Sequence, residues 1–204
     1  MPKGSPELTK SRRDEIMEAG VLLYDKRIFK DITIKDIAEE ITFARSNIYN
    51  YFQTKEEIFL AVFEEEYRSW NEDLKAIAKS GERDVDCAAK KIAASLQKRE
   101  LMLKLLSVNL YDLEENSRME CLVSFKKVYA ASRVHMLKII KNCHPDLTDE
   151  QLLQKMIAVL AYLHGIYPYC YATAKQSEAM KVAGIEPKAQ NVYDLAYAGL
   201  KELV

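Results

Sequence analysis

The sequence lacks several features that would place the protein outside the ordinary globular class. Its 204 residues include only 6 glycines and 5 prolines, too few for collagen, a linker array or a turn-rich all-β protein. No apolar run approaches the roughly 20 residues that a transmembrane helix needs, and residues 1–10 lack the apolar region of a secretory signal. We therefore expect a soluble, cytoplasmic protein with no membrane partner.

Cysteine chemistry is also sparse. The four cysteines contain no Cys-x-x-Cys pair, which is typical of neither a zinc ribbon nor a dense disulfide framework. Cys143, His144 and His135 are unsuited to zinc, because an adjacent Cys and His do not close a tetrahedral site on one element. The sequence predicts reduced, mostly buried thiols at Cys87, Cys121, Cys143 and Cys170, with no metal and no cofactor.

Charge and motif content bear on function. The chain has 30 basic and 31 acidic residues, so a global basic excess is absent and any nucleic-acid site must be local. With 3 histidines, and without a G-x-S-x-G, an H-E-x-x-H or a glycine-rich phosphate loop, the sequence offers no catalytic constellation. We predict that the protein is not an enzyme.

Apolar residues recur at spacings of three and four along nearly the whole chain, and this pattern predicts an all-α fold. The connection 176–187 is expected to be irregular. The expected helices are 9–27, 34–41, 44–52, 55–80, 84–98, 100–113, 117–142, 148–174 and 188–200.

The first helices have the organisation of a helix-turn-helix. A long helix at 9–27 precedes two short ones, and Thr33 and Asp36 form a capping-box pattern at the start of the first short helix. In this motif the second short helix enters the major groove of DNA. Periodicity alone makes the assignment plausible.

The residues themselves are more specific. Three stretches resemble, without a gap, the N-terminal domain of the TetR family of transcriptional repressors: Ile16 to Ala19, Thr33 to Glu40, and Arg45 to Ile58. The most discriminating part is Ile48-Tyr49-x-Tyr51-Phe52-x-x-Lys55-Glu56. The resemblance implies a three-helix DNA-binding domain at 1–55 and a helical effector-binding and dimerisation domain at 56–204.

The chain departs from the family at the turn. Thr42, Phe43 and Ala44 stand where the family usually has Gly, Val and Ser. A non-glycine residue at positive φ would cost about 1–3 kcal/mol, so the turn is either strained or bends differently. The following helix also loses its usual hydroxyl cap.

Candidate DNA contacts follow from the motif. Base reading is assigned to Arg45, Ser46, Asn47 and Tyr49, since Arg and Asn pair bidentately with guanine and adenine. The resemblance places Thr33, Lys35 and Lys55 beside phosphates, and the phenol of Tyr51 could reach one too. The alternatives are a solvated polar face for Arg45 to Asn47 and a core position for Tyr51. Lys10, Arg12 and Arg13 form either a basic arm or a solvated face.

Two later helices carry aromatic and methionine side chains that form plain core or line a cavity. The resemblance implies a small, largely apolar or aromatic effector in this domain. Pro168 is expected to kink its helix near His164. The candidate effector residues are Tyr111, Cys121, Phe125, Tyr129, Met136, Met156, Leu160, His164 and Tyr167.

Helix 148–174 is apolar around most of its circumference, which predicts a homodimer through 148–174 and 188–200. The resemblance then implies a ligand-responsive regulator, a repressor that binds a palindromic double-stranded DNA operator and is released by its effector. The alternative is a helical adaptor that does not bind DNA, or a thiol-based redox sensor using Cys87 or Cys121.

Overall fold

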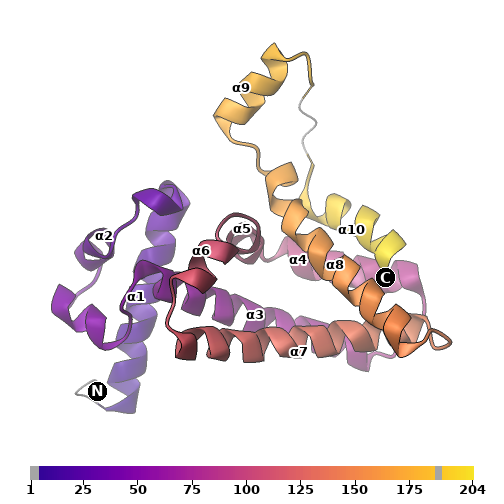
Figure 1. The fold of residues 1–204 in the computed structure, drawn as a ribbon, viewed down its shortest axis with the longest axis horizontal. Helices are drawn as coiled ribbons and strands as arrows, with labels where there is room; N and C mark the ends of the chain where they lie inside the picture. The colour runs from indigo at the N-terminus through magenta and orange to yellow at the C-terminus, as the bar shows by residue number, and fades with distance from the viewer. Residues whose placement is uncertain (1–4, 187–189) are drawn as a thin grey trace. The chain divides into compact units, whose positions relative to one another are not determined.

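The computed structural model describes residues 5–186 and 190–204, and every regular element in these ranges is a helix (Figure 1). This confirms the predicted all-α class. None of the described helices is long and apolar enough to cross a membrane. The elements are α1 (Pro6–Lys26), η1 (Phe29–Asp31), α2 (Ile34–Glu39), η2 (Arg45–Asn50), α3 (Lys55–Lys79), α4 (Val85–Gln97), α5 (Glu100–Val108), α6 (Leu110–Glu115), α7 (Met119–Cys143), α8 (Asp149–Cys170), α9 (Ala174–Val182) and α10 (Val192–Leu203).

The chain forms two compact units. Unit 1 consists of the residues up to Glu65 together with Asn109–Lys127, and unit 2 consists of Glu66–Val108 and Val128–Val204. Unit 1 is therefore larger than the expected domain 1–55, because a segment around α6 and the start of α7 packs with the N-terminal helices.

An aromatic cluster lies at the centre of unit 1. The rings of Tyr24, Phe29 and Phe59 meet edge to face, with centroids 5.1–6.1 Å apart, a favoured geometry for aromatic pairs. The buried Tyr24 hydroxyl donates to the side-chain oxygen of Asn109. The predicted helix 100–113 is two helices, α5 and α6, separated at Asn109, whose φ of −127° is not helical.

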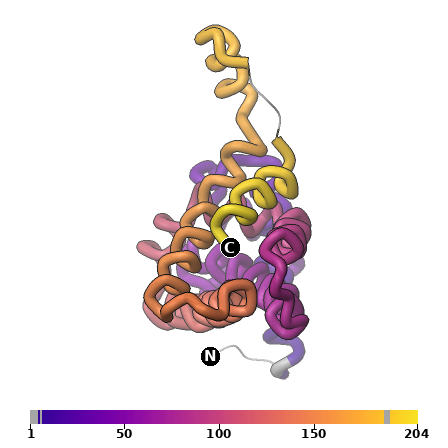
Figure 2. Tube along the Cα trace, turned by 90° about the vertical axis from the view of Figure 1, so that its right-hand side faces the viewer, coloured from indigo at the N-terminus to yellow at the C-terminus, as the bar shows by residue number. Residues whose placement is uncertain are grey.

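In unit 2, α10 packs on α4 and α8, and Figures 1 and 2 show it beside both. Its buried residues are Val192, Ala196 and Leu200. The Tyr162 hydroxyl on α8 donates to the Leu195 carbonyl at 2.7 Å. A Cβ at Gly199 would lie 2.2 Å from the Tyr162 ring, so α8 and α10 approach closely here and an alanine would force the ring to shift.

Three more predicted boundaries were wrong. The helix expected at 148–174 ends at Cys170, because Thr173 pairs with Gln176 in a capping box that starts α9 inside the supposedly irregular connection. The helix expected at 188–200 runs from Val192 to Leu203, and Lys188 lies outside the described residues. The helix expected at 44–52 is a short 3₁₀ helix, η2.

Candidate nucleic-acid interface

The first short helix of the motif, α2, is fixed at its start by the predicted capping box. The Asp36 amide donates to the Thr33 hydroxyl at 3.2 Å, and the Thr33 amide donates to the Asp36 carboxylate at 2.8 Å. Hydrogen bonds from the Thr33 hydroxyl and the Thr33 amide to the carboxylate, with the Arg27 guanidinium 3.1 Å away, lower the pKa of Asp36. The carboxylate therefore stays charged beside the helix N-terminus, which favours negative charge.

The unusual turn after α2 is not strained. Among the described residues, only glycines have positive φ, so Thr42, Phe43 and Ala44 follow a different bend. The Thr42 amide donates to the Glu15 carboxylate on α1, and the Arg12 guanidinium lies 5.3 Å from the centre of the Phe43 ring. Contacts with α1 thus hold the turn in place.

The recognition segment η2 begins without a side-chain cap at Ala44, as predicted. Its bonds join residues three apart: Asn47 N to Ala44 O and Tyr51 N to Ile48 O, both 2.9 Å. In a 3₁₀ helix, side chains three apart align. Ser46 and Tyr49 therefore share one row, whereas an α-helix would pair Arg45 with Tyr49.

Burial orients η2. Ile48 is fully buried and anchors the segment, while Arg45 and Ser46 are exposed and Asn47 is half-buried. The Tyr49 side chain is 49% exposed. The four predicted base-reading side chains thus lie together on a short segment that a core residue holds in place.

The predicted phosphate contacts fall into two groups. Thr33 and Lys35 are exposed at the start of α2, and Tyr51 is partly exposed after η2. The Lys55 ammonium instead donates to the carbonyls of Phe29 at 2.8 Å and Ile32 at 2.9 Å. This differs from the expectation, because the carbonyls around η1 attract the ammonium.

An ion pair that the sequence did not indicate lies beneath this interface. The Glu57 side chain is fully buried, and Arg118 Nε lies 2.6 Å from its Oε1 atom. Glu57 also accepts from the Gln53 amide at 2.7 Å, while the Glu57 amide donates to the Thr54 hydroxyl at 3.1 Å. The capping pattern of Thr54 and Glu57 is readable in the sequence, but nothing local indicates Arg118.

Comparisons with known families agree with this geometry. Residues 16–62 match the family described as bacterial regulatory proteins, tetR family. Residues 64–193, more than half of the chain, match the tetracyclin repressor-like C-terminal domain.

The chain belongs to the TetR family. Its N-terminal residues match the family's helix-turn-helix domain, and most of the remaining residues match the family's C-terminal domain. It is also similar to the uncharacterized HTH-type transcriptional regulator YfiR of Bacillus subtilis (strain 168), with 35% identity over 82 residues, or 38% of each chain. The match therefore covers well under half the length of that relative.

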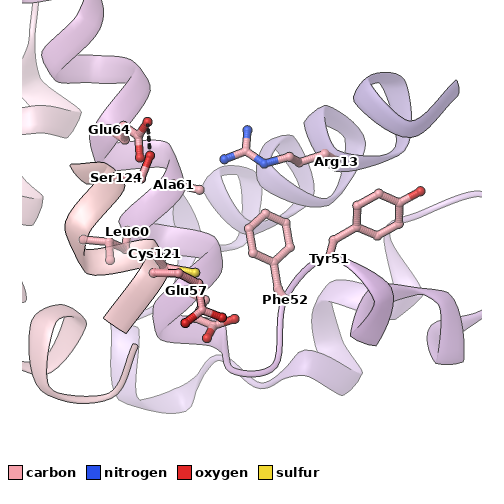
Figure 3. A pocket seen from close by; sticks show the side chains of 10 residues that line it. Arg13, Tyr51, Phe52, Glu57, Leu60, Ala61, Glu64, Cys121 and Ser124 are labelled. Carbon is pink, nitrogen blue, oxygen red and sulfur yellow. Dashed lines mark hydrogen bonds between the residues drawn. The ribbon is translucent and has the colours of Figure 1, made fainter. Parts of the chain in front are cut away.

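In this TetR-family chain a cavity of about 200 Å³ lies within unit 1, next to the end of η2 (Figure 3). Ser124 donates to the Glu64 carboxylate at 3.0 Å on one wall. Of the predicted effector residues, Cys121 lines this cavity. The lining residues are Arg13, Tyr51, Phe52, Glu57, Leu60, Ala61, Glu64, Glu120, Cys121 and Ser124.

Two other predicted effector residues belong to unit 1. Phe125 is buried and stacks on Phe63, with ring centroids 5.0 Å apart. Tyr111 is 79% exposed, contrary to the expectation of a cavity position. The cause is the separate helix α6, in which Leu113 is the buried residue and Tyr111 points away from it.

The remaining candidates lie in unit 2. Met136, Met156 and Leu160 are buried. The Tyr129 ring meets Tyr67 edge to face at 5.7 Å, and Tyr167 stacks on Tyr171 at 4.7 Å. His164 is exposed, which also differs from the expectation, because Leu163 and Ile166 occupy the core side of α8.

The cysteines were predicted to be mostly buried, and this was wrong. All four are free; Cys87 is exposed and the other three are partly exposed. A hydrogen bond to Asp84 raises the pKa of Cys87, and burial raises the pKa of Cys121. Because the thiolate is the reactive form, neither environment favours a redox-sensing thiol.

Proposed function

We propose that the protein is a repressor that binds a palindromic operator as a homodimer in the bacterial cytoplasm and releases it when a small, largely apolar or aromatic effector binds. The observation that carries this proposal is the exposed polar surface of η2. Arg45, Ser46, Asn47 and Tyr49 lie on a segment that the buried Ile48 fixes to the core. Side chains of these types, on a segment that is anchored to the core, suit base reading in the major groove.

Phosphate contacts would set the position of η2 on the duplex. Thr33 and Lys35 lie at the N-terminus of α2, where backbone amides and a positive charge favour phosphate. Tyr51 follows η2 and supplies a phenol. Lys55 would act indirectly, because its ammonium holds the chain around η1 against the start of α3.

The homodimer proposal rests on α8. Leu153 and Ile157 are exposed large apolar side chains four residues apart on this helix, so they form one apolar face. On α10, Val192, Ala196 and Leu200 are buried within the chain, so this helix offers fewer apolar side chains to a partner. In a two-fold dimer the two η2 segments would lie about one turn of DNA, roughly 34 Å, or a multiple of it apart.

The effector proposal rests on unit 2. Tyr129, Met136, Met156, Leu160 and Tyr167 are the candidate residues there, and the methionines are side chains that adapt to irregular ligands. Helix α3 begins next to η2 and continues into unit 2, so it is the candidate element for coupling. An effector that prefers one arrangement would shift operator affinity by about 5- to 150-fold.

An electrophoretic mobility shift with DNA from the gene's own upstream region tests the proposal. We expect a saturable complex with a palindromic fragment that resists competition by scrambled DNA. The affinity should fall with salt as counterions are released. Equal binding to the palindrome and to scrambled DNA would contradict the proposal and favour an adaptor that does not read DNA.

A further inference from the structure

The connection between α8 and α10 is longer than the fold requires. These helices lie side by side, joined by the hydrogen bond from Tyr162 to Leu195. Packed helices are usually joined by about 2–8 residues. In the described part of this connection, residues 171–186 form an excursion from the body of unit 2, and α9 lies away from that body (Figures 1 and 2).

Local signals specify α9 as a helix. At its start the Gln176 amide donates to the Thr173 hydroxyl at 3.2 Å, and the Thr173 amide donates to the Gln176 side chain at 2.8 Å. At its end the Ile185 amide donates to the Met180 carbonyl at 2.9 Å, and Gly184 has a φ of 74°. This is a Schellman motif. Residues of the excursion itself therefore supply the hydrogen bonds that define both ends of α9.

The described part of the chain does not cover this helix. No residue within α9 is buried, Val182 is 82% exposed, and Ile185 just beyond it is 53% exposed. A helix of nine residues is only marginally stable in water on its own propensity. A short helix with capping hydrogen bonds at both ends and no buried residue indicates a surface that docks on a partner.

We propose that α9 is a clasp that docks on a second copy of this chain and extends the dimer interface of α8. The base of this clasp is continuous with the exposed face of α8. The exposed face of α8 runs from Leu153 through Ile157, Ala161 and His164 to Pro168, and the excursion starts where this face ends. A copy that covers the α8 face is therefore next to the base of the clasp.

The area that a stable dimer must bury also favours the clasp. A stable interface buries roughly 800 Å² and about 20–30 residues on each partner. Within α8 the exposed large apolar side chains are Leu153, Ile157 and Tyr169, and α10 uses its main apolar residues inside the chain. One face of one helix supplies too few residues for such an interface. The clasp adds α9 and its flanks, including Val182 and Ile185.

This inference rests on the proposed homodimer, and the experiment separates the two. Val182→Asp places a charge on the clasp, and Val134→Asp is the matched control because Val134 is an exposed valine on α7. Leu153→Asp changes the α8 face. Sedimentation equilibrium on the full chain measures the dimer dissociation constant of each variant, and circular dichroism measures their helix content.

We expect Val182→Asp to raise the dissociation constant at least tenfold and Val134→Asp to leave it within twofold. If Leu153→Asp weakens the dimer while Val182→Asp does not, the clasp is wrong and the homodimer stands. A wild-type chain that stays monomeric at micromolar concentration overturns both.

A photo-crosslinking amino acid at position 182 gives a readout that does not depend on the stability of a variant. Irradiation of the purified full chain should yield a covalent dimer, with the new bond between the clasp and α8 or α9 of the other copy. Adducts only within one chain, or no adduct in a sample that sediments as a dimer, would overturn the clasp.

Discussion

The Arg118 guanidinium and the Glu57 carboxylate form an ion pair that ties the segment before α7 to the end of the recognition segment. Arg118 Nε and Nη2 lie 2.6 and 2.9 Å from the two carboxylate oxygens, and Nη2 lies 3.4 Å from the Tyr51 carbonyl. Glu57 also holds the Gln53 amide. One carboxylate thus fixes the chain that leaves η2.

Replacing Arg118 by Met should destabilise the protein by about 3 kcal/mol, since the buried Glu57 carboxylate loses its charged partner. Operator affinity should fall by more than the loss of folded protein explains, because Tyr51 and Gln53 lose their support. Urea denaturation and anisotropy titrations measure the two effects. Lys126→Met is the control: it removes a partly exposed pair with Glu114, which is worth at most about 1 kcal/mol.

The same pair predicts a pH dependence. Burial alone would raise the pKa of Glu57, but hydrogen bonds from Arg118 and Gln53 outweigh it and hold the pKa below the ordinary value of 4.5. The unfolded state therefore binds the proton more tightly, so the stabilisation is present above about pH 4.5 and is lost as the pH falls through the folded pKa.

Denaturation of the wild type and of Glu57→Gln between pH 3 and 7 tests this. The difference in their free energies of unfolding should shrink as the pH falls below about 4.5. A difference that stays constant over this range would show that the charge of Glu57 does not stabilise the fold.

Gly199→Ala should destabilise unit 2 by about 1–3 kcal/mol, the usual cost of overpacking, because its Cβ would lie 2.2 Å from the Tyr162 ring. Gly165→Ala is the matched control within α8. A Cβ there meets no atom within 4 Å, so helix propensity should stabilise this variant by up to about 1 kcal/mol. Urea midpoints at one protein concentration compare them, and equal midpoints for Gly199→Ala and the wild type would refute the close approach.

Lys55→Met should lower stability by about 1.5–3 kcal/mol, the range for hydrogen bonds to charged groups, since the Phe29 and Ile32 carbonyls lose a charged donor. The salt dependence of DNA binding should stay unchanged. Lys35→Met should do the opposite and lower the salt slope by about one, with little effect on stability. A reduced salt slope for Lys55→Met would restore its expected phosphate contact.

The sequence predicted those features that depend on neighbouring residues. The box of Thr33 and Asp36 and the helix expected at 55–80, found as α3 (Lys55–Lys79), both follow from local chemistry. The α9 helix had equally local signals in Thr173, Gln176 and Gly184. It was missed because its residues show no apolar stripe, and apolar periodicity was the main guide to helices.

Other features depend on residues that are distant in the chain. The Asn109 side chain accepts from Tyr24, the Glu57 side chain pairs with Arg118, and neither partner is marked by spacing or type. Lys55 shows the same limit, because its position in the family motif indicated DNA while the carbonyls around η1 bind its ammonium. The exposure of Tyr111 depends on α6 being a separate helix, and its sequence does not show that separation.

The central claim is that the exposed side chains of η2 read DNA sequence. The most direct test is the ratio of affinities for the palindromic fragment and for scrambled DNA, measured by anisotropy at one salt concentration. Arg45→Ala should weaken binding to the palindrome by about 1–3 kcal/mol and leave binding to scrambled DNA unchanged, so the ratio should fall. Lys35→Met should weaken binding to both DNAs alike. If Arg45→Ala kept the wild-type ratio, η2 would not be the element that reads the operator.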